Sequence, residues 1–203
     1  VERDECSWKI AADGATSKLR KEWRIKSYSW NYTQVCLTAK VLIRGSTSHT
    51  AYELFRPEGP MALLPMGSDL FQLVWSAPDE LCKQRIRLSE SRFLDQLATV
   101  LPEGMQPDIL VNKPAIFPLK CSFTRKLMKR NGILIGESAH RCHPVGGQGL
   151  NLCWRDVDQL MSIMHQLKNN SISISSINRH YIRNRLPDII SINLFTHLLV
   201  ILF

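Results

Sequence analysis

The sequence predicts a mixed α/β or α+β fold, and three stretches of the chain carry this prediction. Residues 27–44 are rich in β-branched and aromatic side chains with partial alternation, which is typical of a strand. Residues 78–101 carry apolar side chains at helical spacing among charged ones. In residues 132–157 a short apolar strand leads through a glycine-rich loop into an amphipathic helical run.

The remaining elements follow from turn signals and short apolar runs. Asp13-Gly14 predicts a turn, and the basic segment around it is expected to be helical. Further strands are expected at residues 51–55, 59–65, 71–76 and 115–123. After a polar linker, a last helix is expected from Ile177, with a break at Pro187. Cys153 and Trp154 are expected in the core.

Length, charge and cysteine usage narrow the class of protein. The chain has 203 residues, of which 44% are apolar, so one or two small domains can each bury a core. Its formal net charge of +8 suits an anionic cofactor, an acidic membrane surface or nucleic acid. The basic residues are scattered and match no nucleic-acid-binding motif, so no nucleic-acid partner is predicted. The six cysteines lie far apart and predict free thiols in a reducing, cytoplasmic compartment.

The segment at residues 132–157 has the residues that a polar, partly anionic cofactor requires. Glu137 follows the strand and can accept hydrogen bonds from sugar-type hydroxyls. Pro144 stiffens the loop, and its glycines let backbone N–H groups approach a ligand closely. The helix expected from Gln148 adds the positive end of its dipole.

A longer pattern in this segment resembles a known motif. It reads Gly136, Glu137, Ser138, Ala139, His140, then His143, Pro144, Gly147, Gln148, Gly149, Asn151, Leu152, Arg155, Asp156 and Val157. This is similar to the second flavin-binding motif of the FAD-dependent aromatic hydroxylases, the group A flavoprotein monooxygenases, and most of all to the branch that hydroxylates ubiquinone precursors. Two positions depart from the motif: Glu137 stands where Asp is usual, and Cys153 where a small Gly is usual.

Residues 11–20 resemble a second motif of the same family. They read Ala-Ala-Asp-Gly-Ala-Thr-Ser-Lys-Leu-Arg, like the middle motif in which an Asp-Gly turn precedes a short helix near the cofactor pyrophosphate. The resemblance implies that Asp13, Gly14 and Arg20 lie toward that pyrophosphate, with Arg20 as its anion partner. The alternative is an ordinary Asp-Gly turn followed by a helix start.

The resemblance also implies an architecture. The chain is expected to form the C-terminal part of an FAD/NAD(P)-binding Rossmann-like fold with an inserted mixed β-sheet substrate domain. The G-x-G-x-x-G turn that opens the family's fold does not occur in the sequence, so an N-terminally truncated chain is expected. Its segments are a remnant of the FAD-binding domain (1–26), the substrate domain (27–125), the second FAD motif with its helix (126–167) and a C-terminal helical segment (168–203).

Site residues follow from these motifs. The expected cofactor-binding residues are Asp13, Gly14, Arg20, Gly136, Glu137, Pro144, Gly146, Gly147, Gln148, Gly149, Leu150 and Asn151. Leu64 and Pro65 lie in a stretch that resembles the family's substrate wall, although an ordinary buried strand flanked by prolines would read the same. No catalytic residue is assigned. His140, Cys142 and His143 lack the spacing of zinc ligands, so no metal is predicted.

The function implied by the resemblance is hydroxylation of the aromatic ring of a ubiquinone-type precursor, with FAD as cofactor and NAD(P)H and O2 as co-substrates. One alternative is a related flavoprotein epoxidase or reductase, and another is a degenerate fragment that acts as a binding or assembly partner. Expected partners are a lipophilic phenol or quinone precursor, and a membrane surface or a quinone-biosynthesis complex. The apolar C-terminal residues 188–203 are expected to pack on the protein or to touch the inner membrane from the cytoplasm.

Overall fold

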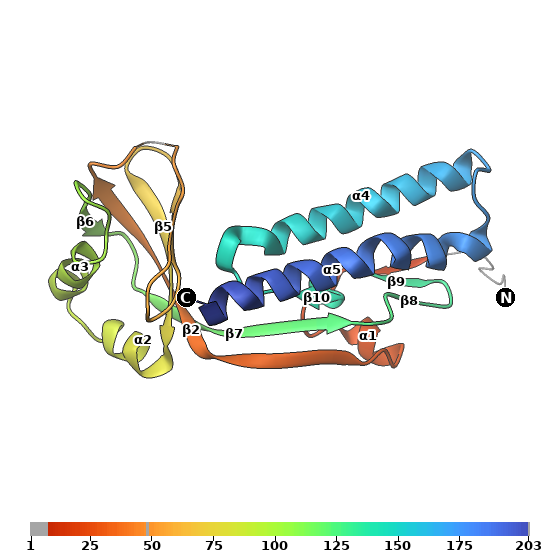
Figure 1. The fold of residues 1–203 in the computed structure, drawn as a ribbon, viewed down its shortest axis with the longest axis horizontal. Helices are drawn as coiled ribbons and strands as arrows, with labels where there is room; N and C mark the ends of the chain where they lie inside the picture. Colours follow the sequence, from red (N-terminus) through yellow and green to blue (C-terminus); the bar gives the residue numbers. More distant parts are fainter. Residues whose placement is uncertain (1–7, 48, 203) are drawn as a thin grey trace. The chain divides into compact units, whose positions relative to one another are not determined.

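A computed structural model describes residues 8–47 and 49–202, and it confirms the mixed α/β class (Figure 1). The chain forms two compact units. Unit 1 comprises the described residues up to Trp30 together with Lys120–Leu198, and unit 2 comprises Asn31–Leu119 and the residues from Leu199. The four functional segments expected from the sequence are a different division from compact units, and they stay a prediction.

Unit 1 contains a small sheet and two long helices. Its elements are β1 (Lys9–Ala11), α1 (Lys18–Glu22), the start of β2 (Ser27–Arg44), the end of β7 (Ala115–Thr124), β8 (Met128–Lys129), β9 (Gly132–Leu134), η1 (Gly136–Ser138), β10 (His140–Arg141), η2 (Val145–Gly147), α4 (Gln148–Lys168), η3 (Ile174–Ser176) and most of α5 (Ile177–Leu202). Strand β9 is fully buried and pairs parallel with β1, so that Ile133 lies opposite Ile10. It pairs antiparallel with β8 on its other side.

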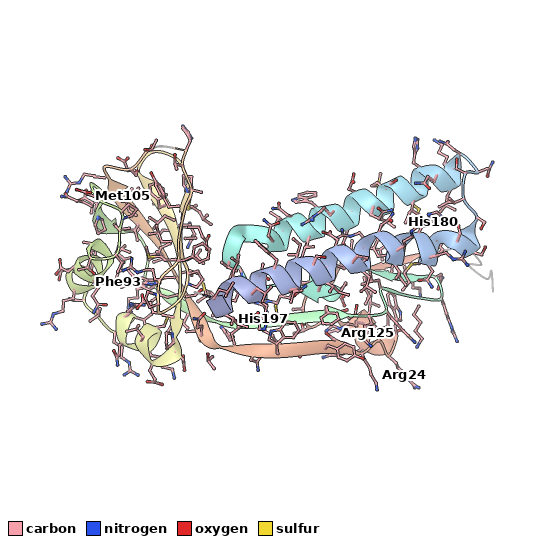
Figure 2. All side chains as sticks on the ribbon, in the orientation of Figure 1. Arg24, Phe93, Met105, Arg125, His180 and His197 are labelled. Carbon is pink, nitrogen blue, oxygen red and sulfur yellow. The ribbon has the colours of Figure 1, made fainter. Side chains whose placement is uncertain are left out.

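Unit 2 is an antiparallel sheet covered by two short helices. Its elements are the rest of β2, β3 (Tyr52–Leu54), β4 (Met61–Pro65), β5 (Leu70–Pro78), α2 (Asp79–Arg85), α3 (Glu90–Ala98), β6 (Gln106–Leu110) and the start of β7. Strand β2 pairs with β5 and β6, β5 with β4, and β4 with β3. Alternate residues of β2 enter the core, where Phe93 of α3 and Met105 also lie (Figure 2).

An ion pair fixes helix α2 to the core of unit 2. The Arg85 guanidinium is buried, lies 3.6 Å from the centre of the Trp75 ring and binds both carboxylate oxygens of Glu58 at 2.9–3.0 Å. Trp75 donates its indole N–H to the same carboxylate at 2.8 Å. The buried charge is therefore neutralised, as a charge inside a core must be.

Two expectations about helices need correction. Helix α5 runs without a break through Pro187, because a proline removes only one helical hydrogen bond and side chains on both sides of it remain anchored. Arg185 and Asp188 provide those anchors, as described below. Among the described residues before β2, only the five residues of α1 are helical, and the nearby strand β1 was not predicted.

Candidate functional site

Strand β9 is followed by a tight turn at Gly136, where the predicted cofactor motif begins. Gly136 adopts φ = 59°, which favours glycine, and a Cβ there would lie 3.4 Å from the sulfur of Cys153. The Gly136 N–H donates to Asp156 of α4 at 2.7 Å. Ser138, in the same turn, is buried, and its Oγ lies 2.6 Å from the carbonyl oxygen of Ala11.

The glycine-rich loop opens helix α4 where the sequence predicted. Gly146 and Gly147 have φ of 72° and 62°, and no side chain caps the helix that begins at Gln148. A substituent at either glycine would meet open space, so the loop leaves room beside the helix start. N–H groups in the first turn of a helix have no partners within that helix, and the dipole makes this end positive. The arrangement therefore fits an electron-rich ligand edge.

A pocket of about 330 Å³ lies between this helix start and the turn at Glu137. Glu137, Arg141, Gly149 and Leu150 are among its lining residues. The Glu137 carboxylate is half exposed, and Arg141 approaches it at 3.8 Å. Burial raises the pKa of Cys142, which also lines this pocket, to about 11, so its thiol is neutral at pH 7 and is no nucleophile.

Asp156 holds the turn, strand β10 and both long helices together. Its carboxylate accepts from the Gly136 N–H, from His140 Nε2 and from Arg185 Nε, all at 2.7 Å. Burial alone would raise the pKa of Asp156, but the hydrogen bonds from His140, Gly136 and Arg185 outweigh it and lower that pKa. Arg185 also pairs with Asp188, which binds Arg155 at 2.6 Å.

The two motifs, far apart in the sequence, lie side by side in unit 1. Arg20 donates to the carbonyl oxygens of Ser138 at 2.6 Å and Ala15 at 2.8 Å. The Ile135 N–H donates to Ala11 at 3.0 Å, extending the β1–β9 pairing. Arg20 thus links the Asp-Gly motif to the second motif, and its role as an anion partner stays a prediction.

Asp13 and Gly14 have the contacts of a turn and a helix start. The Asp13 carboxylate accepts from the N–H groups of Lys18 and Leu19 at 2.7 and 3.1 Å, and Gly14 has φ = 79°. Desolvation opposes ionisation of Asp13, but the hydrogen bonds from Ser17 and these backbone groups lower its pKa. An ordinary Asp-Gly turn followed by a helix start therefore accounts for the local contacts. The proximity of this segment to the second motif agrees with a role in cofactor binding.

The remaining site residues differ in exposure. Pro144, Leu150 and Asn151 are exposed at the loop and the helix start, and Gln148 donates to the Gly146 carbonyl at 3.0 Å. In unit 2, Leu64 is 43% exposed and Pro65 is half buried at the end of β4, so Leu64 does not belong to the core of that unit.

Some expectations were wrong and some residues were missed. Trp154 was expected in the core but is 62% exposed, because the buried face of α4 carries Leu152, Asp156 and Leu160 instead. Sequence reasoning did not find Ser138 or Arg185 as structural partners of the motif. No local pattern marks these contacts, because they join residues far apart in the chain. Ser138 contacts Arg20 and Ala11, which are 118 and 127 residues away, and Arg185 contacts Asp156, which is 29 residues away.

His140 and His143 each contact a neighbouring group of the protein. Within residues 8–47 and 49–202, no three His, Cys, Asp or Glu side chains are grouped so that they could hold a metal ion. His140 binds Asp156, and His143 accepts from the Val145 N–H at 3.2 Å. Burial, followed by repulsion from His197, lowers the pKa of His143 to about 4.

Comparison with known protein sequences agrees with these motifs. The family described as FAD binding domain matches residues 2–180. The mitochondrial ubiquinone biosynthesis monooxygenase COQ6 of Danio rerio is 27% identical over 230 residues, covering 93% of this chain and 47% of that protein. The 3-demethoxyubiquinol 3-hydroxylase of Escherichia coli K12 is 29% identical over 155 residues, covering 76% and 39%. The uncharacterized protein slr1300 of Synechocystis is 33% identical over 174 residues, covering 84% and 42%. The chain spans less than half the length of these relatives.

Solved structures share the fold. PqsL of Pseudomonas aeruginosa, a probable FAD-dependent monooxygenase, aligns with a TM-score of 0.78 and 18% identity, over 93% of this chain and 54% of that one. The anhydrotetracycline hydroxylase OxyS of Streptomyces rimosus aligns with a TM-score of 0.68 and 18% identity, over 97% and 39%. At such identities the likeness shows the fold alone.

Replacing Asp156 by Asn should destabilise the protein strongly. The change keeps the side-chain volume but leaves the buried Arg185 without its full negative partner, which costs about 3 kcal/mol. Urea unfolding measures the loss. Asp158→Asn, the same chemical change at an exposed position of α4, should stay within about 0.5 kcal/mol of the wild type. Equal losses in the free energy of unfolding would show that Asp156 stabilises the protein no more than an exposed aspartate does.

The titration of His143 should make the protein less stable in mild acid. The folded protein holds this ring neutral down to a pKa of about 4, whereas the unfolded chain protonates it near 6.5. Unfolding therefore takes up a proton between these pH values, and the free energy of unfolding should fall by up to about 3 kcal/mol across that window. It changes no further below pH 4 on account of this group.

The comparison of two variants isolates this contribution from other titrating groups. His143→Asn keeps an acceptor for Val145 and removes the titration, so its stability should depend less on pH between 6.5 and 4 than that of the wild type. His165→Asn, at an exposed position, should keep the wild-type slope. A His143→Asn curve parallel to the wild-type curve would refute the assignment.

Proposed function

This chain belongs to the FAD binding domain family, and from this premise we propose that it forms the flavin-ring side of a ring-hydroxylating monooxygenase. The substrate we propose is a lipophilic phenol or quinone precursor, and NAD(P)H and O2 are the co-substrates. The observation that carries the proposal is the uncapped start of α4, opened by left-handed Gly146 and Gly147, beside the pocket that Glu137 lines.

The residues around this pocket fit FAD by their chemistry. The half-exposed Glu137 carboxylate can accept hydrogen bonds from the hydroxyls of the ribityl chain. Backbone N–H groups of Gly147 to Asn151 can stabilise negative charge at the edge of a reduced ring. Leu150, two-thirds exposed at the helix start, offers apolar surface to a ring. When bound, FAD supplies electron transfer and oxygen activation.

The protein's own contribution is orientation and charge. Asp156 fixes the Gly136 N–H and His140, so the turn that carries Glu137 cannot rotate independently of α4. Glu137 and Arg141 line the pocket with charged side chains, and the raised pKa of Cys142 keeps its thiol neutral beside them. These residues bind and position, and no acid–base residue is proposed.

The substrate class rests on two supports. The relatives from Danio rerio and Escherichia coli are named for ubiquinone biosynthesis and for hydroxylation of demethoxyubiquinol. In unit 2, Leu64 and Pro65 at the end of β4 offer apolar surface suited to a prenylated ring, since each buried CH₂ contributes about 0.8 kcal/mol.

A membrane surface, reached from the cytoplasm, is the proposed source of such a substrate, and a quinone-biosynthesis complex is a further proposed partner. Helix α5 is long and apolar enough to cross a membrane by length and composition, a property that core helices of soluble proteins also have. In unit 1 its exposed apolar residues include Ile190, Leu194, Phe195 and Leu198. These side chains support contact with lipid at the periphery of the inner membrane.

One alternative is a chain that acts as a binding or assembly partner and does not catalyse hydroxylation. An epoxidase or a reductase of the same fold would differ in product.

The visible absorption spectrum of the purified chain, recorded after incubation with FAD and desalting, tests the proposal. We expect retained oxidised-flavin bands, and hydroxylated product when NAD(P)H and a prenylated phenol are added. Gly147→Val, which forces a β-branched residue into a left-handed conformation, should lose the bands, whereas Gly67→Val at an exposed turn of unit 2 should keep them. No flavin retention would favour the binding-partner alternative, and retention with an epoxide as product would favour the related enzyme.

Glu137→Asp should bind FAD more tightly than the wild type. The extra methylene of Glu137 moves the carboxylate by about one bond from the place that the usual Asp gives it, so shortening the side chain should restore one hydrogen bond. We expect a dissociation constant roughly two- to tenfold lower. Flavin fluorescence titration measures it, with Glu80→Asp at an exposed site as the matched control. Unchanged affinity in Glu137→Asp would count against this role.

A further inference from the structure

A second pocket in unit 1 lies at the end of the small sheet opposite the turn at Gly136. Its volume is about 420 Å³, within the range of small-molecule sites. Lys9 begins β1 and Gly132 begins β9, and both residues line this pocket. The two strands run parallel from there to Ala11 and Leu134, beyond which the two motifs begin. The pocket is therefore separate from the one at the start of α4, which other residues line.

The lining of this second pocket is strongly cationic. Four of its eight residues are basic, and Glu22 is the only acidic one among the described residues that line it. Within residues 8–47 and 49–202, none of the four cations forms an ion pair with a carboxylate. Like charges gathered around one hollow raise its positive potential and attract an anion. The basic residues are Lys9, Arg24, Lys129 and Arg130.

Two of these cations are arginines held in a backbone conformation that disfavours them. Arg24 has φ = 52° in the turn after α1, and Arg130 has φ = 53° in the turn between β8 and β9. A side chain as long as that of arginine is strained in this left-handed region. Only five described residues other than glycine have a positive φ, and these two line the same pocket. Backbone strain of this kind is concentrated at ligand and active sites.

Trp23 provides this pocket with a fixed aromatic wall. A Cβ at Gly132 would lie 2.7 Å from the Trp23 ring, so the half-buried ring rests directly on the backbone of β9. Lys129 donates to the Trp23 carbonyl oxygen at 2.5 Å, which joins β8 to the end of α1. An aromatic surface beside two guanidinium groups suits a ligand that has both a carbon skeleton and an anionic group.

We propose that this pocket binds a phosphorylated small molecule, with Arg24 and Arg130 on the phosphate and Trp23 against the carbon skeleton. Four cations and one carboxylate leave the lining with a net charge of +3. A phosphate monoester carries a charge of about −1.5 to −2 at pH 7, so it matches this excess better than a single carboxylate does. The phosphate can come from a free metabolite or from the head group of an anionic lipid. The site goes beyond the proposed function, because it needs no flavin.

Calorimetric titration of the full chain with phenyl phosphate tests the site, because this probe has both a ring and a phosphate group. We expect saturable binding that weakens as salt is added and that is tighter than the binding of inorganic phosphate. Arg130→Asn should weaken it roughly three- to tenfold, since one charge-assisted hydrogen bond is lost at an exposed position. Asparagine tolerates the left-handed backbone, so the urea midpoint of this variant should equal or exceed that of the wild type.

A matched variant and a competitor make the test specific. Arg87→Asn, the same change at an exposed turn of unit 2, should leave the affinity for phenyl phosphate unchanged. FAD should not displace the probe, and displacement would place the probe in the cofactor pocket and overturn the inference. The inference is also overturned if phenyl phosphate does not bind saturably, or if the two arginine variants bind it equally well. Flavin retention is measured separately, so the proposed function stands or falls independently.

Co-sedimentation with phosphatidylcholine vesicles, with and without phosphatidic acid, identifies the source of the phosphate. Binding to the vesicles with phosphatidic acid that phenyl phosphate competes away and Arg130→Asn weakens would assign the pocket to a lipid head group. Saturable binding of phenyl phosphate without such sedimentation would assign it to a free phosphorylated metabolite.

Discussion

The arrangement of unit 1 depends on one buried carboxylate, that of Asp156. Burial penalises its charge, and three donors from separate parts of the chain compensate: the Gly136 N–H, His140 and Arg185. Each donor alone would be an ordinary hydrogen bond. Because they share one acceptor group, the turn after β9, the strand β10 and helix α5 are positioned relative to α4 at a single point. The pocket at Glu137 is shaped by this junction rather than by the loop alone.

Three buried arginines, Arg85, Arg185 and Arg20, differ in the groups that surround their charge. Glu58 neutralises Arg85 inside unit 2, and the pair packs on Trp75. Asp156 and Asp188 neutralise Arg185. Arg20 differs from both, since the partners of its guanidinium within the described residues are carbonyl oxygens and none is a carboxylate. Two of these buried arginines are therefore neutralised by carboxylates, and the third is held by backbone dipoles.

Local patterns in the sequence predicted the fold class and several elements around the site, because these depend on interactions between residues close together in the chain. Residues 27–44 form β2 with the predicted bounds, since a long β-branched run has no competing helical period. The glycine-rich loop predicted the start of α4 near Gln148, and Gly147 stands at that N-cap with a left-handed backbone that glycine adopts easily. Contacts between residues far apart in the chain have no such local sequence pattern. Strand β1 is three residues long and exists through its pairing with β9. The exposure of Trp154 and the continuity of α5 through Pro187 depend on which face of each helix is packed, which helical spacing alone does not determine.

The discontinuity of unit 1 has a consequence for biosynthesis. Strand β1 leaves the ribosome before its partner β9, which follows only after the whole segment of unit 2 up to Leu119 has been translated. At ordinary elongation rates this is a delay on the order of ten seconds, during which unit 2 can fold while β1 still lacks its partner β9. Arg185 emerges later still. The turn that Asp156 holds can therefore mature only after Arg185 has emerged, and a cell that degrades or chaperones nascent chains would act on this region mainly in that interval.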